Sequence, residues 1–207
     1  MAKSMSVIFK IFSILTKIEL FFIKRKFLHF GNNIKIGYLP NISNKENIIL
    51  GNNLILGNYA TLSTINFNLF TIQHPILKIG NNIYIGHNVS IHCMNNVELE
   101  DNVVLSDYIY ISDVSHGLEM TENVSIMNQP WISYGKVKIG NGTFLGHGVK
   151  VMPNVIIGKN CIVAAGSVVT KSFEDYSLIA GSPAKLLKKY CFETKTWRKI
   201  NLRGIFI

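Results

Sequence analysis

The residue best suited to proton transfer in this 207-residue sequence is His116, within the stretch SDVSHG at residues 112–117. A general base must accept a proton near neutral pH, and histidine is the side chain whose ordinary pKa suits that task. His116 is expected on a loop, next to Gly117. Asp113 either orients the imidazole through its second nitrogen, as in a catalytic triad, or forms a turn. The sequence predicts His116 as the catalytic base, with Asp113 as its candidate partner.

Three further side chains are candidates for contact with a substrate. His92 follows Ile91 at a point where the spacing of aliphatic residues slips by two positions, and it is expected to face the substrate. His87 stands in a predicted turn, where it either fills the turn or contacts a substrate bound by a neighbouring subunit. Trp131 either stacks on a ring of the ligand or packs against the protein.

Metal binding and disulfide formation are not expected. The histidines lack the spacing of a three-ligand metal site. The three cysteines, Cys93, Cys161 and Cys191, are scattered and odd in number, which indicates reduced thiols in a cytoplasmic setting. Cys93 is expected to be a small buried residue rather than a nucleophile.

Aliphatic residues recur at every sixth position through most of residues 34–170. The longest such run is Ile139, Leu145, Val151, Ile157, Val163 and Val169. A period of six is not helical, and the segments are short and rich in β-branched residues, so they are predicted to be strands. Glycine and asparagine between them tolerate the left-handed backbone of tight turns.

Three six-residue units would close one triangular coil of eighteen residues, and the coils would stack because no coil is stable alone. Residues 112–138 interrupt the repeat. A solenoid expels such an insertion as a loop, which often shapes the binding face. The expected organisation is a basic amphipathic segment at 1–30, a β-helix at 31–170 with the inserted loop, and a basic segment at 171–207. Short helices are expected in both terminal segments.

The pattern [LIV]-G-x-x-x-x, with IVAAGSVVTKSF at residues 162–173 and IAGSPAKLLKK at 179–189, resembles the hexapeptide-repeat acyltransferases. Over roughly residues 31–189 the sequence is most similar to the O-acetyltransferases of maltose, galactoside, O-antigen and capsule sugars. The resemblance implies an all-β, left-handed parallel β-helix that assembles as a homotrimer and uses acetyl-CoA as co-substrate. His116 matches the residue that this family uses as general base.

The resemblance also implies which residues hold acetyl-CoA. His147 matches a position that lines the acyl-CoA groove, Ala165 matches a contact to the pantetheine arm, and Phe144 stands where relatives often carry tryptophan. The residues that match the nucleotide end are Thr170, Lys171, Lys185 and Lys188. Two of these positions are often arginine in relatives, and lysine keeps the charge but loses bidentate geometry. The alternative is that these lysines are solvated charges.

The net charge of +9 is concentrated at the two ends of the chain. Residues 1–35 carry seven bases and one acid, residues 36–170 carry six bases and eight acids, and residues 171–207 carry eight bases and three acids. No basic face with interleaved aromatic residues and no nucleic-acid-binding motif is recognisable, so nucleic acid is not an expected partner.

The apolar stretch at residues 6–30 is repeatedly interrupted by charges, so it is not expected to span a bilayer. As a helix it would gather Lys10, Ser13, Lys17 and Lys24 in one polar stripe. Such a helix would either lie on an anionic membrane surface or pack on the main domain or a neighbouring subunit.

The sequence therefore predicts an acetyl-CoA-dependent O-acetyltransferase that acts on a sugar hydroxyl in O-antigen, capsule or other surface polysaccharide biosynthesis. Its expected location is the cytoplasm, and peripheral contact with the inner membrane through the N-terminal segment is one of the two interpretations of that segment. Two alternatives stay open. One is an N-acetyltransferase of an amino sugar or another small amine, which an acceptor screen distinguishes. The other is a non-catalytic β-helix scaffold, which would not bind acetyl-CoA.

Overall fold

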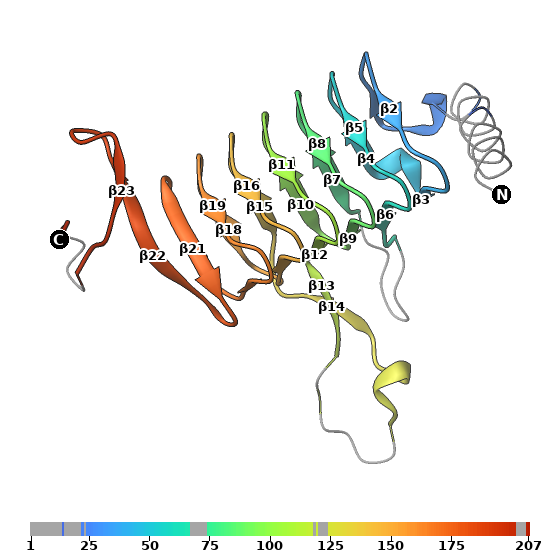
Figure 1. Ribbon diagram of the computed structural model, residues 1–207. Coiled ribbons are helices and arrows are strands. Elements are labelled where there is room, and N and C mark those ends of the chain that lie inside the picture. The colour runs from blue at the N-terminus through green and yellow to red at the C-terminus, as the bar shows by residue number, and fades with distance from the viewer. Residues whose placement is uncertain are drawn as a thin grey trace, which may run out of the picture.

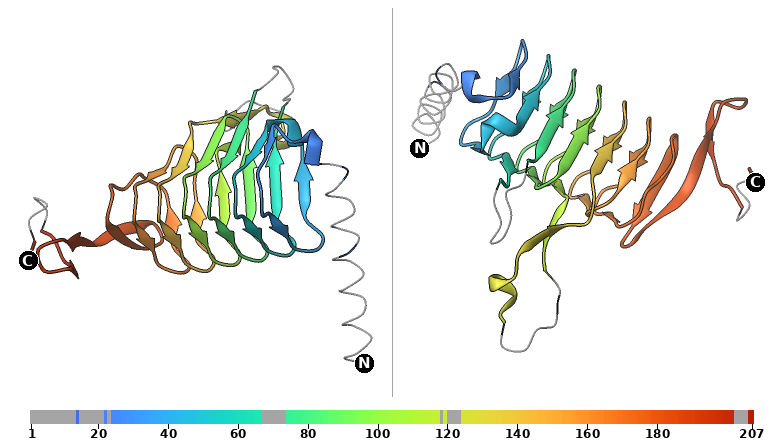
Figure 2. Two further views of the ribbon diagram at one scale, coloured as in Figure 1. Left: turned by 90° about the horizontal axis from the view of Figure 1, so that it is seen from above. Right: turned by 180° about the vertical axis from the view of Figure 1, so that it is seen from behind.

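The chain is an all-β, left-handed parallel β-helix, seen here in a computed structural model that describes residues 14, 22, 24–66, 74–117, 119, 124–201 and 206–207. Three sheets run along the axis of the helix, and each coil contributes one short strand to each sheet (Figure 1). Figure 2 shows the same row of stacked coils from two further directions, with an arm projecting from the middle of the row.

The three sheets are called A, B and C. Sheet A contains β1 (His29–Phe30), β4 (Ile48–Leu50), β7 (Ile76–Ile79), β10 (Asn96–Leu99), β15 (Val137–Ile139) and β18 (Ile156–Ile157). Sheet B contains β2 (Lys35–Ile36), β5 (Ile55–Leu56), β8 (Tyr84–Ile85), β11 (Val104–Leu105), β16 (Phe144–Leu145), β19 (Ile162–Val163), β21 (Ser177–Gly181), β22 (Ala184–Cys191) and β23 (Thr196–Arg198). Sheet C contains β3 (Asn41–Ser43), β6 (Thr61–Thr64), β9 (Ser90–Cys93), β12 (Tyr110–Ser112), β17 (Lys150–Val151) and β20 (Val168–Val169).

The core consists of the aliphatic residues that define the repeat. In sheet B, for example, Ile85, Leu105, Leu145 and Val163 occupy the same register in successive coils and are fully buried. Burial of these side chains is the main driving force for stacking, because each coil covers the apolar side chains of the next.

The turns between sheets explain the many asparagines. Asn82 and Asn102 have φ angles of 57° and 60°, in the left-handed region, and the amide of Asn82 donates to Oδ1 of Asn102 at 3.2 Å. Asparagine adopts this backbone more readily than most residues, and stacked amides satisfy one another's hydrogen bonds.

The expected coil of eighteen residues is correct only near the C-terminal end. Stacked residues are 20 positions apart between Asn82 and Asn102, and 18 apart between Thr143 and Cys161. The two extra residues lie where sheet C passes to sheet A. There β9 and β10 are four residues long, and each buries two alternate side chains instead of one. This is the physical cause of the two-residue slip in the aliphatic spacing.

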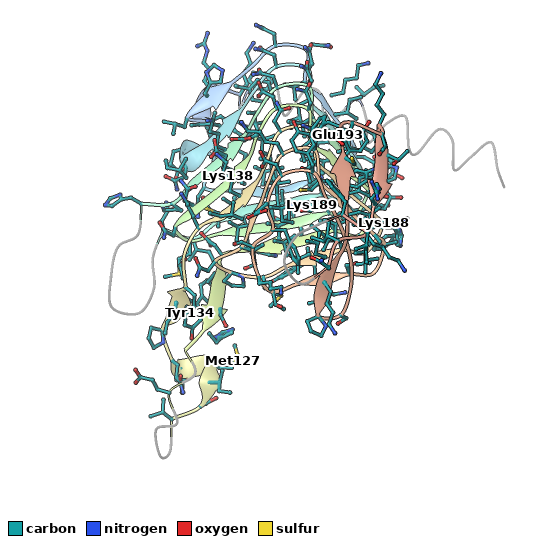
Figure 3. All side chains as sticks on the ribbon, turned by 90° about the vertical axis from the view of Figure 1, so that its left-hand side faces the viewer. Met127, Tyr134, Lys138, Lys188, Lys189 and Glu193 are labelled. Carbon is teal, nitrogen blue, oxygen red and sulfur yellow. The ribbon has the colours of Figure 1, made fainter. Side chains whose placement is uncertain are left out.

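The insertion expected at residues 112–138 forms a projecting arm. Its base is a two-stranded antiparallel ribbon of β13 (Val114–His116) and β14 (Trp131–Ser133), and the 3₁₀ turn η3 (Ile126–Asn128) lies farther out. Figure 3 shows the arm leaving the body, with Tyr134 near the body and Met127 farther along it. Two other 3₁₀ turns are η1 (Lys24–Lys26) and η2 (Lys45–Asn47).

A short helix is expected in the C-terminal segment, but the described residues of that segment, 171–201 and 206–207, contain none. β21 still pairs in parallel with β19, so the stack continues past residue 170, and β22 and β23 then add antiparallel strands to sheet B. The expected N-terminal helix falls mostly outside the described residues. Within the part of the chain that the structure describes, no helix is long and apolar enough to cross a membrane.

Candidate active site

A pocket of about 480 Å³ lies between the outer face of sheet C and the base of the arm. Sheet C and the turns that follow its strands contribute Ile65, His92, Tyr110, Met152 and Pro153. The start of the arm contributes Ser112, Val114, Ser115 and His116, and the returning strand contributes Trp131. The structure therefore brings together three residues that the sequence singled out, namely His92, His116 and Trp131.

His116 is the last residue of β13 and lies opposite Trp131 of β14. The two rings meet edge to face, with centroids 5.9 Å apart and an angle of 86° between the planes. Nδ1 of His116 is buried, and it has no hydrogen-bond partner among the described residues. The ribbon thus places the imidazole at the wall of the pocket, next to the ring of Trp131.

The expected pairing of Asp113 with His116 is wrong in this structure. The Asp113 side chain is fully buried and faces the turn between β9 and β10. Its Oδ1 accepts the backbone N–H of Met94 at 2.7 Å, and its Oδ2 accepts those of Asn95 at 2.9 Å and Asn96 at 2.8 Å. Burial raises the pKa of this carboxyl, and the three backbone donors oppose that rise. The alternative reading, a turn-forming aspartate, is the correct one.

His92 projects from β9 into the pocket beside Tyr110, with ring centroids 5.7 Å apart. Burial lowers the pKa of His92, because desolvation disfavours the imidazolium. His92 is therefore a neutral hydrogen-bonding group at neutral pH, which suits contact with an uncharged polar ligand.

Cys93, next to His92, faces the interior of the coil and is fully buried. Burial, and then the nearby Asp113 carboxylate, raise the pKa of its thiol well above the ordinary value. A thiolate nucleophile is therefore not available at this position.

His87 lies outside the pocket, at the corner where sheet B passes to sheet C. Its ring Nδ1 accepts the backbone N–H of Asn58 at 2.9 Å, and the backbone N–H of His87 donates to Oδ1 of Asp107 at 2.7 Å. The imidazole thus takes part in the stacking of turns, as the turn-filling alternative requires. His87 is not among the residues that line the pocket around His116, and its contact with a substrate bound by a neighbouring subunit stays a prediction.

Two residues expected at the acyl-CoA groove, His147 and Ala165, lie in the last two coils, at the corner where sheet B passes to sheet C. His147 packs against Tyr108 with ring centroids 5.2 Å apart, and Ala165 is exposed one coil later. An added Cβ on Gly148 or Gly166 would have no atom within 4 Å, so open space borders this corner. The small residues leave a surface that a narrow chain can approach closely.

Phe144 and the residues expected at the nucleotide end lie elsewhere on the C-terminal coils. Phe144 is 40% exposed on the outer face of sheet B. Thr170 and Lys171 follow β20, and the Lys171 ammonium lies 5.7 Å from the centre of the Phe173 ring. Lys185 and Lys188 are on β22, opposite Ala180 and Leu178 (Figure 3 labels Lys188). None of these residues lines the pocket around His116.

Several residues of the pocket were not expected from the sequence, among them Tyr110, Ser112 and Met152. Ser112 pairs with His92 in the neighbouring coil, twenty positions earlier, and Tyr110 pairs with Ser90. A coil length of twenty would have placed Ser112 beside His92, whereas the assumed length of eighteen does not. The structure also shows no cluster of three potential metal ligands within the residues it describes.

Residues 136–171 match the family model described as bacterial transferase hexapeptide (six repeats). The match covers β15 to β20, which are the coils with the shorter, eighteen-residue spacing.

Among curated proteins, the chain is similar to a putative lipopolysaccharide biosynthesis O-acetyl transferase, WbbJ, of Escherichia coli strain K12. The two are 49% identical over 63 residues, which are 30% of this chain and 32% of that protein. The chain therefore matches about a third of that relative's length.

Two solved structures share the fold over most of the chain. One is AntD, an N-acyltransferase from Bacillus cereus in complex with dTDP and 3-hydroxybutyryl-CoA, with a TM-score of 0.70, 22% identity, and coverage of 85% of this chain and 90% of that chain. The other is a maltose O-acetyltransferase from Clostridium difficile 630, with a TM-score of 0.58, 22% identity, and coverage of 81% and 72%. At these identities the likeness concerns the fold.

Proposed function

The chain is a hexapeptide-repeat protein of the bacterial transferase type, and on that premise we propose that it transfers an acetyl group from acetyl-CoA to a hydroxyl of a sugar or glycan. The observation that carries the proposal is the position of His116, on a ribbon that holds its imidazole at the wall of a 480 Å³ pocket. A general base needs a position within hydrogen-bond reach of the proton that it takes from a bound acceptor.

In the proposed reaction, His116 takes the proton of the acceptor hydroxyl. The hydroxyl oxygen forms a bond to the acetyl carbonyl carbon, and the bond from that carbon to the sulfur of coenzyme A breaks. The imidazolium then gives its proton to the departing thiolate, so atoms and charge balance. No covalent acyl-enzyme is needed, which agrees with the buried thiol of Cys93.

The lining of the pocket supports a neutral acceptor. Its described side chains include the apolar Ile65, Val114 and Met152, the aromatic Tyr110 and Trp131, and the polar Ser112, but no lysine, arginine or carboxylate. A sugar ring has an apolar face that stacks on aromatic side chains, and its hydroxyls hydrogen-bond to neutral groups. His92 and Trp131 are the proposed substrate contacts.

The corner formed by His147, Gly148 and Ala165 is the proposed path of the pantetheine arm of acetyl-CoA. Its small residues leave open space beside exposed backbone, which the amide groups of pantetheine can approach closely. Phe144, Thr170, Lys171, Lys185 and Lys188 remain the proposed contacts of the cofactor's other parts. The lysines supply the positive charge that its phosphates require.

A homotrimer is proposed on the basis of an exposed apolar column on sheet B. Ile55, Tyr84, Val104 and Phe144 follow one another in register in four successive coils, and they are between 36% and 43% exposed. Contiguous exposed apolar side chains are typical of an interface with another protein surface. In such an assembly a neighbouring copy would close the acyl-CoA groove.

A role in O-antigen, capsule or other surface polysaccharide biosynthesis is proposed, with the protein working in the cytoplasm near the inner membrane. The basic, apolar residues 6–30 are the proposed membrane contact. Vesicles that contain anionic lipid should retain the full chain more strongly than a chain that lacks residues 1–30. Equal retention would argue against membrane contact.

The test of the reaction is a coenzyme A release assay with acetyl-CoA and a panel of neutral sugars, glycans and amino sugars. His116→Ala should lower kcat by roughly 10²- to 10⁴-fold, because a general base contributes about that much. His29→Ala, on the first coil, is the matched control and should keep wild-type turnover. Undiminished turnover in His116→Ala would overturn the role of His116. Preference for an amine acceptor would replace O-acetylation by N-acetylation, and failure to bind acetyl-CoA would favour a scaffold.

A further inference from the structure

Two buried side-chain atoms lack a hydrogen-bond partner among the described residues, and they are chemically complementary. They are Nδ1 of His116, which donates a hydrogen bond when it is protonated, and Oε1 of Gln129, which can only accept a hydrogen bond. Buried polar atoms are nearly always paired, so an unpaired donor and an unpaired acceptor in one region call for an explanation.

Both residues belong to the base of the arm. The N–H of Gly117 donates to the carbonyl of Pro130 at 2.9 Å, so the residue after His116 is bonded to the residue after Gln129. A Cβ added to Gly117 would lie 2.8 Å from Oε1 of Gln129. The amide oxygen of Gln129 therefore lies against residue 117, which follows His116 in the sequence.

The orientation of the Gln129 amide is fixed by its other end. Nε2 donates to the backbone carbonyl of Glu119 at 2.7 Å, and the side chain is only 7% exposed. A carbonyl oxygen requires a donor, so the reverse orientation would place two acceptors in contact. Oε1 is consequently the atom that faces Gly117, away from Glu119.

We propose that Gln129 is a positioning residue for His116: its Oε1 accepts the Nδ1–H of the imidazole when the pocket is occupied. This hydrogen bond fixes the proton on Nδ1 and leaves the lone pair of Nε2 for the acceptor hydroxyl, as a general base requires. The inference rests on the proposed role of His116. In this proposal Gln129 takes the orienting role that the sequence suggests for Asp113, because the Asp113 carboxylate accepts the backbone N–H groups of residues 94–96 instead.

Two substitutions separate positioning from packing. Gln129→Met keeps the length of the side chain but removes the acceptor, and Gln129→Glu keeps an acceptor and adds negative charge. Gln129→Met should lower kcat/KM by roughly 10- to 100-fold, the range found when a residue that orients a metal-binding histidine is replaced. Gln129→Glu should keep most of the activity at high pH and move the acidic limb of the kcat/KM profile upward by roughly one pH unit, because a carboxylate stabilises the imidazolium.

The tautomer of His116 is measured independently of activity, by ¹⁵N NMR of the ring nitrogens, with His116→Ala to assign the signals. Spectra are recorded with and without acceptor and coenzyme A. The wild-type ligand complex should show Nδ1 protonated and Nε2 bare, and Gln129→Met should shift the population toward the Nε2–H tautomer. Ser125→Ala is the matched control, because it removes the Ser125 Oγ to Met127 N–H bond elsewhere in the same arm. It should leave the tautomer unchanged.

The proposal is overturned if both Gln129 variants lower only the melting temperature and leave the tautomer and the pH profile as in the wild type. That result would give Gln129 a structural role through Glu119 alone. If His116→Ala retains full turnover, the proposed function fails instead, and the NMR measurement still reports whether the hydrogen bond exists.

Discussion

Asp113 accepts the backbone N–H of Met94 in a hydrogen bond of 2.7 Å, which ties the root of the arm to the turn of the preceding coil. The two residues are 19 positions apart. Because the carboxylate also accepts two further N–H groups of that turn, one side chain holds both the start of the arm and the passage from β9 to β10.

Asp113→Ala should lower the free energy of unfolding by about 2–4 kcal/mol, because it leaves several buried N–H groups without a partner. The free energy of unfolding of Asp113→Asn should lie between those of Asp113→Ala and the wild type, since one oxygen remains to accept the Met94 N–H. Denaturant unfolding measures both. The kcat of the folded Asp113→Asn protein should stay within about fivefold of wild type. A loss near 10⁴-fold at unchanged stability would instead indicate a triad.

Ala165→Phe should raise the KM for acetyl-CoA at least tenfold, because the ring would occupy the open corner beside Gly148 and Gly166. Stability should change little, since Ala165 is exposed. Lys159→Phe, at the exposed corner between sheets A and B of the same coil, is the control for an added surface ring and should leave KM unchanged. Equal KM values for the two variants would place the cofactor elsewhere.

The melting temperature should fall as the pH is lowered from 6.5 toward 5, and His92 should be one cause. Burial holds the pKa of His92 below its ordinary value of 6.5. Below that pH the unfolded chain therefore binds a proton that the folded chain does not, and stability declines until the folded-state pKa is reached. In His92→Asn this part of the decline should disappear. If the melting temperatures of the wild type and His92→Asn fall by the same amount across this pH range, His92 does not contribute to the decline.

Thr143→Val should lower the free energy of unfolding by about 1–3 kcal/mol. Thr143 is fully buried, donates to the carbonyl of Gly158 at 2.8 Å, and accepts the N–H of Cys161 at 3.0 Å. Valine has the same shape but leaves both backbone groups unpaired. Thr61→Val, at a half-buried position on the outer face of sheet C, should change stability by less than about 0.5 kcal/mol. Similar losses in the two variants would contradict a special role for Thr143.

Much of the fold could be predicted from the sequence because the repeat is local. Ile139, Leu145 and Val151 mark inward positions by their spacing alone, and the neighbouring glycines mark turns. The coil length was not encoded in the same way. In the longer strands two side chains point inward instead of one. Cys93 is the additional inward residue of β9 and Val97 that of β10, and both interrupt the six-residue spacing. The spacing alone does not assign them to these strands.

The C-terminal strands and the role of Asp113 depend on contacts between distant residues, which spacing cannot reveal. Residues 184–191 contain lysines and leucines that favour a helix locally, but pairing with β21 makes them a strand. The Asp113 carboxylate finds its donors 17 to 19 positions away. The position of His116 at the base of the arm could be predicted, because the start of the insertion is visible in the sequence itself. Its role as the general base stays a prediction.

The reversal of direction at β22 has a consequence for self-association. A parallel β-helix ends in unpaired strand edges, and a second molecule could in principle continue the stack there, coil upon coil, into a filament. Sheets A and C end at β18 and β20, but sheet B continues into strands that run the opposite way. An incoming coil would need three matching edges at once, but β22 covers the edge of sheet B and a parallel bridge from Phe173 to Ile157 covers that of sheet A. The antiparallel pair of β21 and β22 thus disfavours end-to-end stacking of molecules and favours discrete assemblies over fibres.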